Sequence, residues 1–186
     1  MDIKPFKDTF ITDNEAFYYP ESVLKSHESN IKFDKIVTIQ WRRVWPKKRR
    51  GQHRILNNGP QLADKLASVL PKNILIRLIN NAVLTMDEQI SLMRNTDYLI
   101  GTHGAGLSLS MFLPNNSILN EFQHIKSNRN KSVLSLVSAL SGHRTYIDKI
   151  NNIFRKTDEA ELISYDEDEF AQSVLKHMKE NNFFSE

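Results

Sequence analysis

The residue types best suited to chemistry gather in one short segment, Gly101-Thr102-His103-Gly104-Ala105-Gly106. A bound phosphate needs several backbone N–H groups within hydrogen-bond distance, and glycines leave those groups unobstructed. The hydroxyl of Thr102 and the ring of His103 add side-chain donors for a phosphate or a sugar. This composition predicts a phosphate-binding turn. A plain strand-to-helix turn, with His103 as a local cap, is the alternative that the spacing leaves open.

A run of basic residues without an intervening acid precedes this turn in the chain: Arg42, Arg43, Lys47, Lys48, Arg49, Arg50 and Arg54. Arg42 and Arg43 follow an expected strand, where guanidinium groups can pair bidentately with a diphosphate. Trp41 or Trp45 can stack on a base or a sugar. A solvated anion patch is the alternative for the lysines and arginines that follow, and interleaved Trp and Arg also suit single-stranded nucleic acid.

Acidic and imidazole side chains supply the remaining candidates. Glu121 ends an expected strand, where a carboxylate can accept hydrogen bonds from ribose hydroxyls or form a salt bridge that faces a helix. His143 and Arg144 either line the pocket or form a solvent-exposed pair. No group of residues has metal-ligand spacing, and the absence of cysteine excludes a thiolate metal site. A general base for group transfer would be a carboxylate or a histidine, but the pattern singles out none.

Strands and helices alternate along the chain and position these residues. Apolar and β-branched runs predict strands at residues 36–39, 74–79, 98–100, 117–122 and 145–147. Helical spacing predicts helices near residues 62–70, 86–93, 107–112, 133–140 and 170–178. The alternation predicts an α/β fold: a Rossmann-like parallel sheet of about five strands with helices on both faces. The loops that follow parallel strands meet at one edge of the sheet, which is where ligands bind in such folds.

The length of 186 residues predicts one domain with one core. Residues 1–34 show no sustained periodicity and are expected to form an irregular lead-in with a short helix near residues 21–25, whereas residues 35–186 form the Rossmann-like domain. The N-terminus has no apolar signal region, and no apolar run approaches the roughly 20 residues of a membrane span. Taken as a complete chain, the sequence predicts a cytoplasmic location.

Several of these segments together resemble glycosyltransferase family 61. The central match is Asp97-Tyr98-Leu99-Ile100-Gly101-Thr102-His103-Gly104-Ala105-Gly106-Leu107, followed by Met111-Phe112-Leu113-Pro114 and the strand that ends in Glu121. Upstream, the resemblance includes Arg42-Arg43, Arg54-Ile55-Leu56-Asn57 and Glu88-Gln89, and it covers about residues 35–148.

The resemblance implies an inverting transfer from a UDP-sugar to a glycan or glycoprotein acceptor, with no obligatory metal and no cofactor besides the donor. It implies a GT-B scaffold of two Rossmann-like domains, of which this chain is similar to the donor-binding half, and a location in the Golgi or ER lumen. An N-terminal acceptor domain is then an expected partner. The residues that the resemblance assigns to the donor are Arg42, Arg43, Arg54, Gly101, Thr102, His103, Gly104, Ala105, Gly106 and Glu121.

Two other functions stay open at this point. A non-catalytic protein that binds a nucleotide sugar would use the same glycine turn. A nucleic-acid-binding module would instead use the basic loop at residues 41–54, and its affinity would fall steeply with salt.

Overall fold

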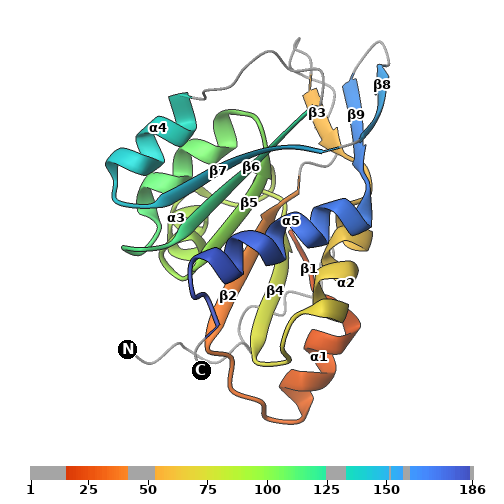
Figure 1. The fold of residues 1–186 in the computed structure, drawn as a ribbon, viewed down its shortest axis with the longest axis vertical. Coiled ribbons are helices and arrows are strands. Elements are labelled where there is room, and N and C mark those ends of the chain that lie inside the picture. Colours follow the sequence, from red (N-terminus) through yellow and green to blue (C-terminus); the bar gives the residue numbers. More distant parts are fainter. Residues whose placement is uncertain (1–15, 42–52, 125–132, 151, 157–159, 185–186) are drawn as a thin grey trace.

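A computed structural model of the chain describes residues 16–41, 53–124, 133–150, 152–156 and 160–184. A six-stranded sheet in the order β1-β4-β2-β5-β6-β7 forms its centre (Figure 1). Its strands are β1 (Phe17–Tyr18), β2 (Lys35–Gln40), β4 (Ile74–Ile79), β5 (Tyr98–Thr102), β6 (Ile118–His124) and β7 (Arg144–Ile150). Five of them are mutually parallel, as predicted, and β1 is antiparallel to β4 at one edge.

Helices cover both faces of this sheet, which confirms the predicted α/β, Rossmann-like class. One face carries α2 (Gly59–Val69) and α5 (Glu167–Glu180), with α1 (Glu21–Glu28) packed on α2. The other face carries α3 (Met86–Arg94), the 3₁₀ helix η2 (Ala105–Phe112) and α4 (Val133–Leu140).

The chain also contains structure that the periodicity did not predict. Residues 16–34 include β1 and α1, so the sheet starts before residue 35, although the short helix near residues 21–25 is confirmed. A second, three-stranded sheet has the order β3-β9-β8 and consists of β3 (His53–Leu56), β8 (Asn152–Lys156) and β9 (Ala160–Tyr165). Strand β3 pairs with β9 across more than a hundred residues of sequence, and local patterns carry no signal for such a pairing.

The sheet separates two hydrophobic clusters. The larger cluster joins α2 and α5 to β2 and β4, and its fully buried members include Leu62, Leu66 and Val174. The smaller cluster lies under α3 and η2 around Leu99 and Leu119. Because both faces are covered, β4 is buried along its whole length, which is why its sequence is a nearly unbroken apolar run.

Local signals account well for the helix ends. A capping box opens α3, since Thr85 Oγ1 accepts from the Glu88 N–H and the Glu88 carboxylate accepts from the Thr85 N–H. Gly142 follows α4 with a φ of 83°, the left-handed conformation in which glycine commonly ends a helix. Met86, the first residue of α3, lies outside the packed face of this helix and is 59% exposed.

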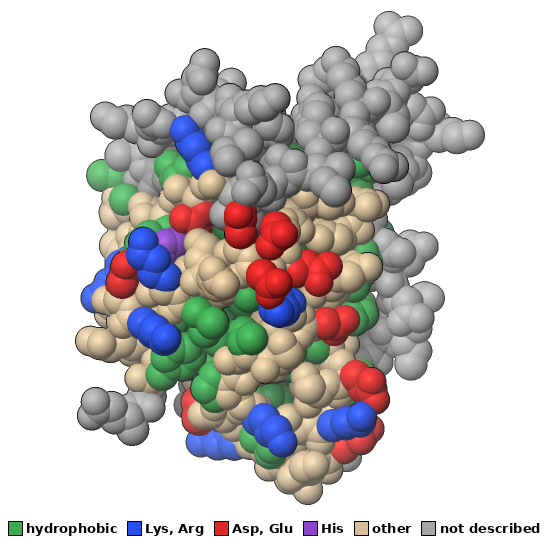
Figure 2. Space-filling view, turned by 45° about the vertical axis from the view of Figure 1, so that its right-hand side comes forward, with side chains coloured by type: hydrophobic (Ala, Val, Ile, Leu, Met, Phe, Trp, Pro, Cys, Tyr) green, Lys and Arg blue, Asp and Glu red, His purple; other side chains and the backbone are tan. Residues whose placement is uncertain are grey.

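Acidic residues near the C-terminus form the start of α5. Asp166 is the N-cap of α5 and accepts from the N–H groups of Asp168 and Glu169. Figure 2 shows acidic side chains gathered on this face of the molecule. Lys65 on α2 lies 2.5 Å from an Asp168 carboxylate oxygen, and this pair joins α2 to the start of α5.

A buried polar cluster holds the other half of α5 on the sheet. His177 stacks on Tyr146 with ring centroids 3.7 Å apart. Its Nδ1 lies 3.3 Å from Asn120 Nδ2 and 3.4 Å from the Tyr98 hydroxyl, and its Nε2 lies 3.5 Å from Asp148 Oδ1. Burial lowers the pKa of His177 below its ordinary value of 6.5, and the nearby Asp148 carboxylate offsets only part of this effect.

This lowered pKa predicts a loss of stability in weak acid. The unfolded chain protonates His177 at a higher pH than the folded chain, so the free energy of unfolding falls as the pH drops below 6.5 toward the folded pKa. Burial lowers the pKa of His143 as well, with the same sign. Urea unfolding between about pH 7.5 and pH 5.5 measures this fall, and we expect it to be shallower in a His177→Gln variant. Equal pH dependence of the two proteins would contradict the assignment.

Candidate functional site

The glycine turn leaves the carboxyl end of β5 in the middle of the parallel sheet. The turn packs tightly at Gly101, since a Cβ at this position would stand 2.6 Å from Leu107 Cδ2 and 3.4 Å from Gln40 Oε1. Gln40, from the end of β2, donates its side-chain N–H to the Gly106 carbonyl at 3.0 Å. The next parallel strand along the sheet therefore fixes the path of the turn.

The short helix predicted after the turn is present and is a 3₁₀ helix, η2. The Leu107 N–H donates to the Gly104 carbonyl at 3.0 Å. The N–H groups of Ala105 and Gly106 come before this bond and have no acceptor within the helix. These two N–H groups lie at the N-terminus of a helix that follows a glycine. Such an N-terminus can bind an anion through its N–H groups.

The turn brings His103 onto Glu121, which comes from the neighbouring strand β6. The His103 Nδ1 lies 2.5 Å from Glu121 Oε1, and the same oxygen accepts from Gln123 Nε2 at 2.8 Å. The Glu121 side chain is 0% exposed, whereas that of His103 is 23% exposed. A buried carboxylate is thus held by two nitrogen groups, and the imidazole of the pair reaches solvent.

Strand alternation explains why these side chains meet. Glu121 and Gln123 are two residues apart on β6 and therefore share one face of the sheet. In the parallel pair of β5 and β6, Gly101 is opposite Glu121 and Thr102 is opposite Phe122. His103, the next residue after β5, is therefore close to the end of β6. The His103 N–H then donates to the Phe122 carbonyl at 3.1 Å.

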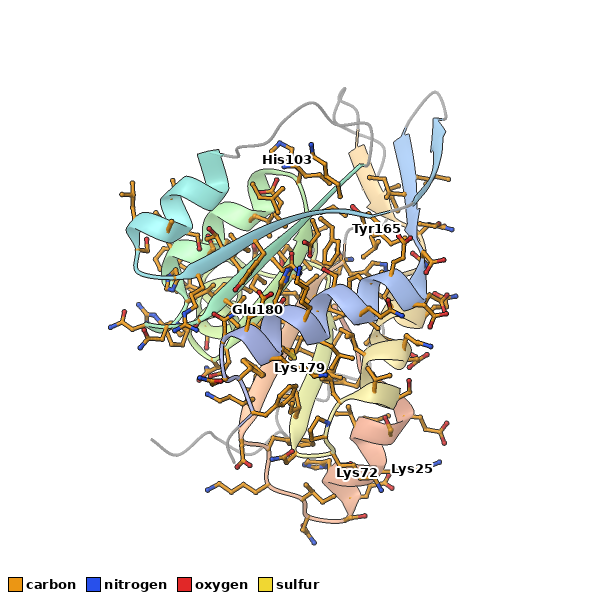
Figure 3. The ribbon with its side chains drawn as sticks, viewed as in Figure 1. Lys25, Lys72, His103, Tyr165, Lys179 and Glu180 are labelled. Carbon is orange, nitrogen blue, oxygen red and sulfur yellow. The ribbon has the colours of Figure 1, made fainter. Side chains whose placement is uncertain are left out.

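Figure 3 shows His103 near the upper end of the sheet, in the turn that follows β5. Tyr165, from β9, donates its hydroxyl to the same Phe122 carbonyl at 3.2 Å. The second sheet is thus tied to the strand that carries Glu121.

The other residues predicted to bind the sugar donor lie in different parts of the chain. Thr102 is buried at the end of β5, with an exposed fraction of 8%. Arg54 lies on β3, in the second sheet and opposite Glu161 in the register. Arg42 and Arg43 lie outside the described residues. Their donor roles, like those of the glycine turn and Glu121, stay predictions.

Two other sequence-based interpretations need revision. Trp41 donates its indole N–H to the Leu56 carbonyl at 3.0 Å and packs against the core, so it has a structural role and is not an open stacking surface. His143 is not part of a solvent-exposed pair, because it is only 6% exposed beneath α4. Arg144 is exposed and bonds Asn181 with its guanidinium.

Sequence reasoning missed Gln40 and Gln123, the two amides that support the turn and the carboxylate. Both lie at the carboxyl ends of buried strands and are themselves buried, with exposed fractions of 7% and 3%. A polar residue that ends an otherwise apolar parallel strand is the signal that identifies such positions.

Two searches of the described residues bear on chemistry and location. They contain no group of three or more His, Asp or Glu side chains that could hold a metal ion. None of the helices described is long and apolar enough to cross a membrane.

Comparison with known proteins assigns the chain to a family. The sequence model of Glycosyltransferase 61 matches residues 8–119, which is more than half of the chain. The protein belongs to glycosyltransferase family 61 and is a glycosyltransferase, an enzyme class that takes a sugar donor and an acceptor. The match includes the glycine turn and ends two residues before Glu121. A search of curated proteins found no match.

Proposed function

We propose that this chain binds the UDP-sugar of an inverting glycosyltransferase and supplies the donor-binding half of a GT-B fold. The acceptor is then a glycan or glycoprotein, and the enzyme is located in the Golgi or ER lumen. One observation carries the proposal: a glycine turn follows the carboxyl end of the central parallel strand β5, and His103 of this turn contacts the buried carboxylate of Glu121. Ligands of open parallel sheets bind at this edge.

The contacts suggest how the diphosphate sits. The N–H groups of Ala105 and Gly106 start η2, and we assign them to the phosphate oxygens, whose approach side chains longer than alanine would obstruct. Arg42, Arg43 and Arg54 are the proposed cationic partners of the diphosphate. Glu121 is fully buried, so we assign it to His103 and not to the ribose.

Calorimetry with UDP, UDP-xylose and UDP-N-acetylglucosamine tests this function. We expect saturable binding of at least one of them, weakened about tenfold or more in Arg43→Ala because a charge-assisted pair is lost. Lys179→Ala is the matched control, because Lys179 is an exposed cation on α5, away from His103 in Figure 3. No heat from UDP or any UDP-sugar at millimolar concentration would remove the proposal.

Donor binding is expected to be independent of divalent metal. Backbone N–H groups donate hydrogen bonds to a diphosphate, and guanidinium groups neutralise its charge. Mg²⁺ neutralises the diphosphate in sites that lack such groups. The dissociation constant of UDP, measured with EDTA and then with added Mg²⁺ or Mn²⁺, should change less than about threefold. A tenfold gain in affinity with either metal would show that a cation completes the site.

A further inference from the structure

The two ring nitrogens of His103 have different surroundings. Nδ1 lies on Glu121 Oε1 at 2.5 Å, and the carboxylate is completely buried. With Nδ1 committed to Glu121, any contact between this ring and a ligand is made through Nε2. The role of His103 in the reaction therefore depends on which nitrogen carries the proton.

The carboxylate of Glu121 determines which way the hydrogen bond runs, because an ionised carboxylate oxygen can only accept. An amide nitrogen can only donate, so Glu121 Oε1 acts as an acceptor toward Gln123 Nε2. The same oxygen then accepts from His103 Nδ1–H. In the neutral ring the proton is on Nδ1, and Nε2 presents a lone pair.

A histidine oriented in this way by a buried carboxylate is the arrangement of a general base. The carboxylate holds the ring in one tautomer and stabilises the imidazolium that forms when Nε2 takes a proton. Direct binding of a phosphate oxygen would need the opposite state, with a hydrogen on Nε2.

We infer that His103 is the catalytic base of the transfer, with Glu121 and Gln123 as its positioning residues. This inference rests on the proposed function. The acceptor hydroxyl oxygen attacks the anomeric carbon of the sugar, and its proton moves to His103 Nε2. The bond from the anomeric carbon to the phosphate oxygen breaks, and its electron pair leaves with UDP. The imidazolium then returns its proton to water.

The protonation of the ring in the UDP complex tests this role without requiring turnover. Long-range ¹H–¹⁵N NMR correlations report each ring nitrogen, and a His103→Asn variant identifies the signals by their loss. We expect Nδ1 protonated and Nε2 bare in the complex near neutral pH. A hydrogen on Nε2 in that complex would overturn the inference, because His103 would then be a donor to the phosphate.

The His103→Asn variant adds a kinetic test. An asparagine amide nitrogen can keep the contact with Glu121, but the variant has no nitrogen in place of Nε2. We expect its affinity for UDP to stay within about threefold, while UDP release from the donor at saturation falls about a hundredfold or more. An unchanged rate at saturation with weaker donor binding would assign His103 to binding alone. If the unmodified chain does not bind UDP, the proposed function fails first, and the base role fails with it.

Discussion

The substitution Glu121→Gln should lower the rate of sugar transfer by about 10²–10⁴-fold at saturating donor, roughly 3–5 kcal/mol of activation free energy. The glutamine keeps an oxygen that can accept from His103 Nδ1 and from Gln123, whose nitrogens are 2.5 Å and 2.8 Å from Glu121 Oε1. It removes the negative charge that stabilises an imidazolium in a buried site. The loss should thus appear in kcat and leave the KM for the donor little changed.

Two measurements separate this effect from misfolding. The thermal unfolding midpoint of Glu121→Gln should remain near that of the unmodified chain, since the size of the side chain is unchanged. Lys179→Ala, on the exposed side of α5, should leave the rate unchanged. A Glu121→Gln enzyme that retains full kcat would show that the carboxylate charge plays no part in the reaction.

The second large effect is expected from Gly101→Ala, which should destabilise the fold by about 1–3 kcal/mol. The new Cβ would stand 2.6 Å from Leu107 Cδ2, and because Leu107 of η2 is fully buried, its side chain must repack against its neighbours to admit this atom. For a chain of this length, such a cost lowers the unfolding midpoint by about 2–12 °C. Donor binding should weaken too, because the clash displaces the start of the helix that follows the turn.

A double-mutant cycle isolates the clash. Leu107→Val lacks the Cδ2 atom, so Gly101→Ala should be less costly in that background than in the unmodified chain. If the effects of the two substitutions on the free energy of unfolding are strictly additive, the Leu107 side chain is not the group with which a Cβ at residue 101 clashes.

Much of the fold was predictable because its strands are short apolar runs that end at clear turn residues. Residues 74–79 and 98–100 read as buried strands, and both belong to the parallel sheet. Helix ends such as the capping box of Thr85 with Glu88 and the left-handed Gly142 depend on local conformation, which needs no tertiary information. The second sheet was missed because β3 and β9 are far apart in sequence and pair only in the folded chain.

The site was predictable at the turn and not around it. Three glycines in six residues identify a close backbone approach, and the periodicity of the chain placed Glu121 at the end of the next expected strand along the sequence. The pairing of His103 with Glu121 depends on strand register, which spacing does not give. Trp41 was misread for a similar reason: only the fold shows that its indole bonds Leu56.

The most direct test of the central claim is to titrate the ¹⁵N-labelled chain with UDP and follow its backbone amide signals. If the glycine turn holds the diphosphate, the amides of Gly104, Ala105 and Gly106 should shift most and saturate with one dissociation constant. Gly142, a capping glycine after α4, is the internal control and should not move. Shifts confined to other residues, or none at millimolar UDP, would contradict the account.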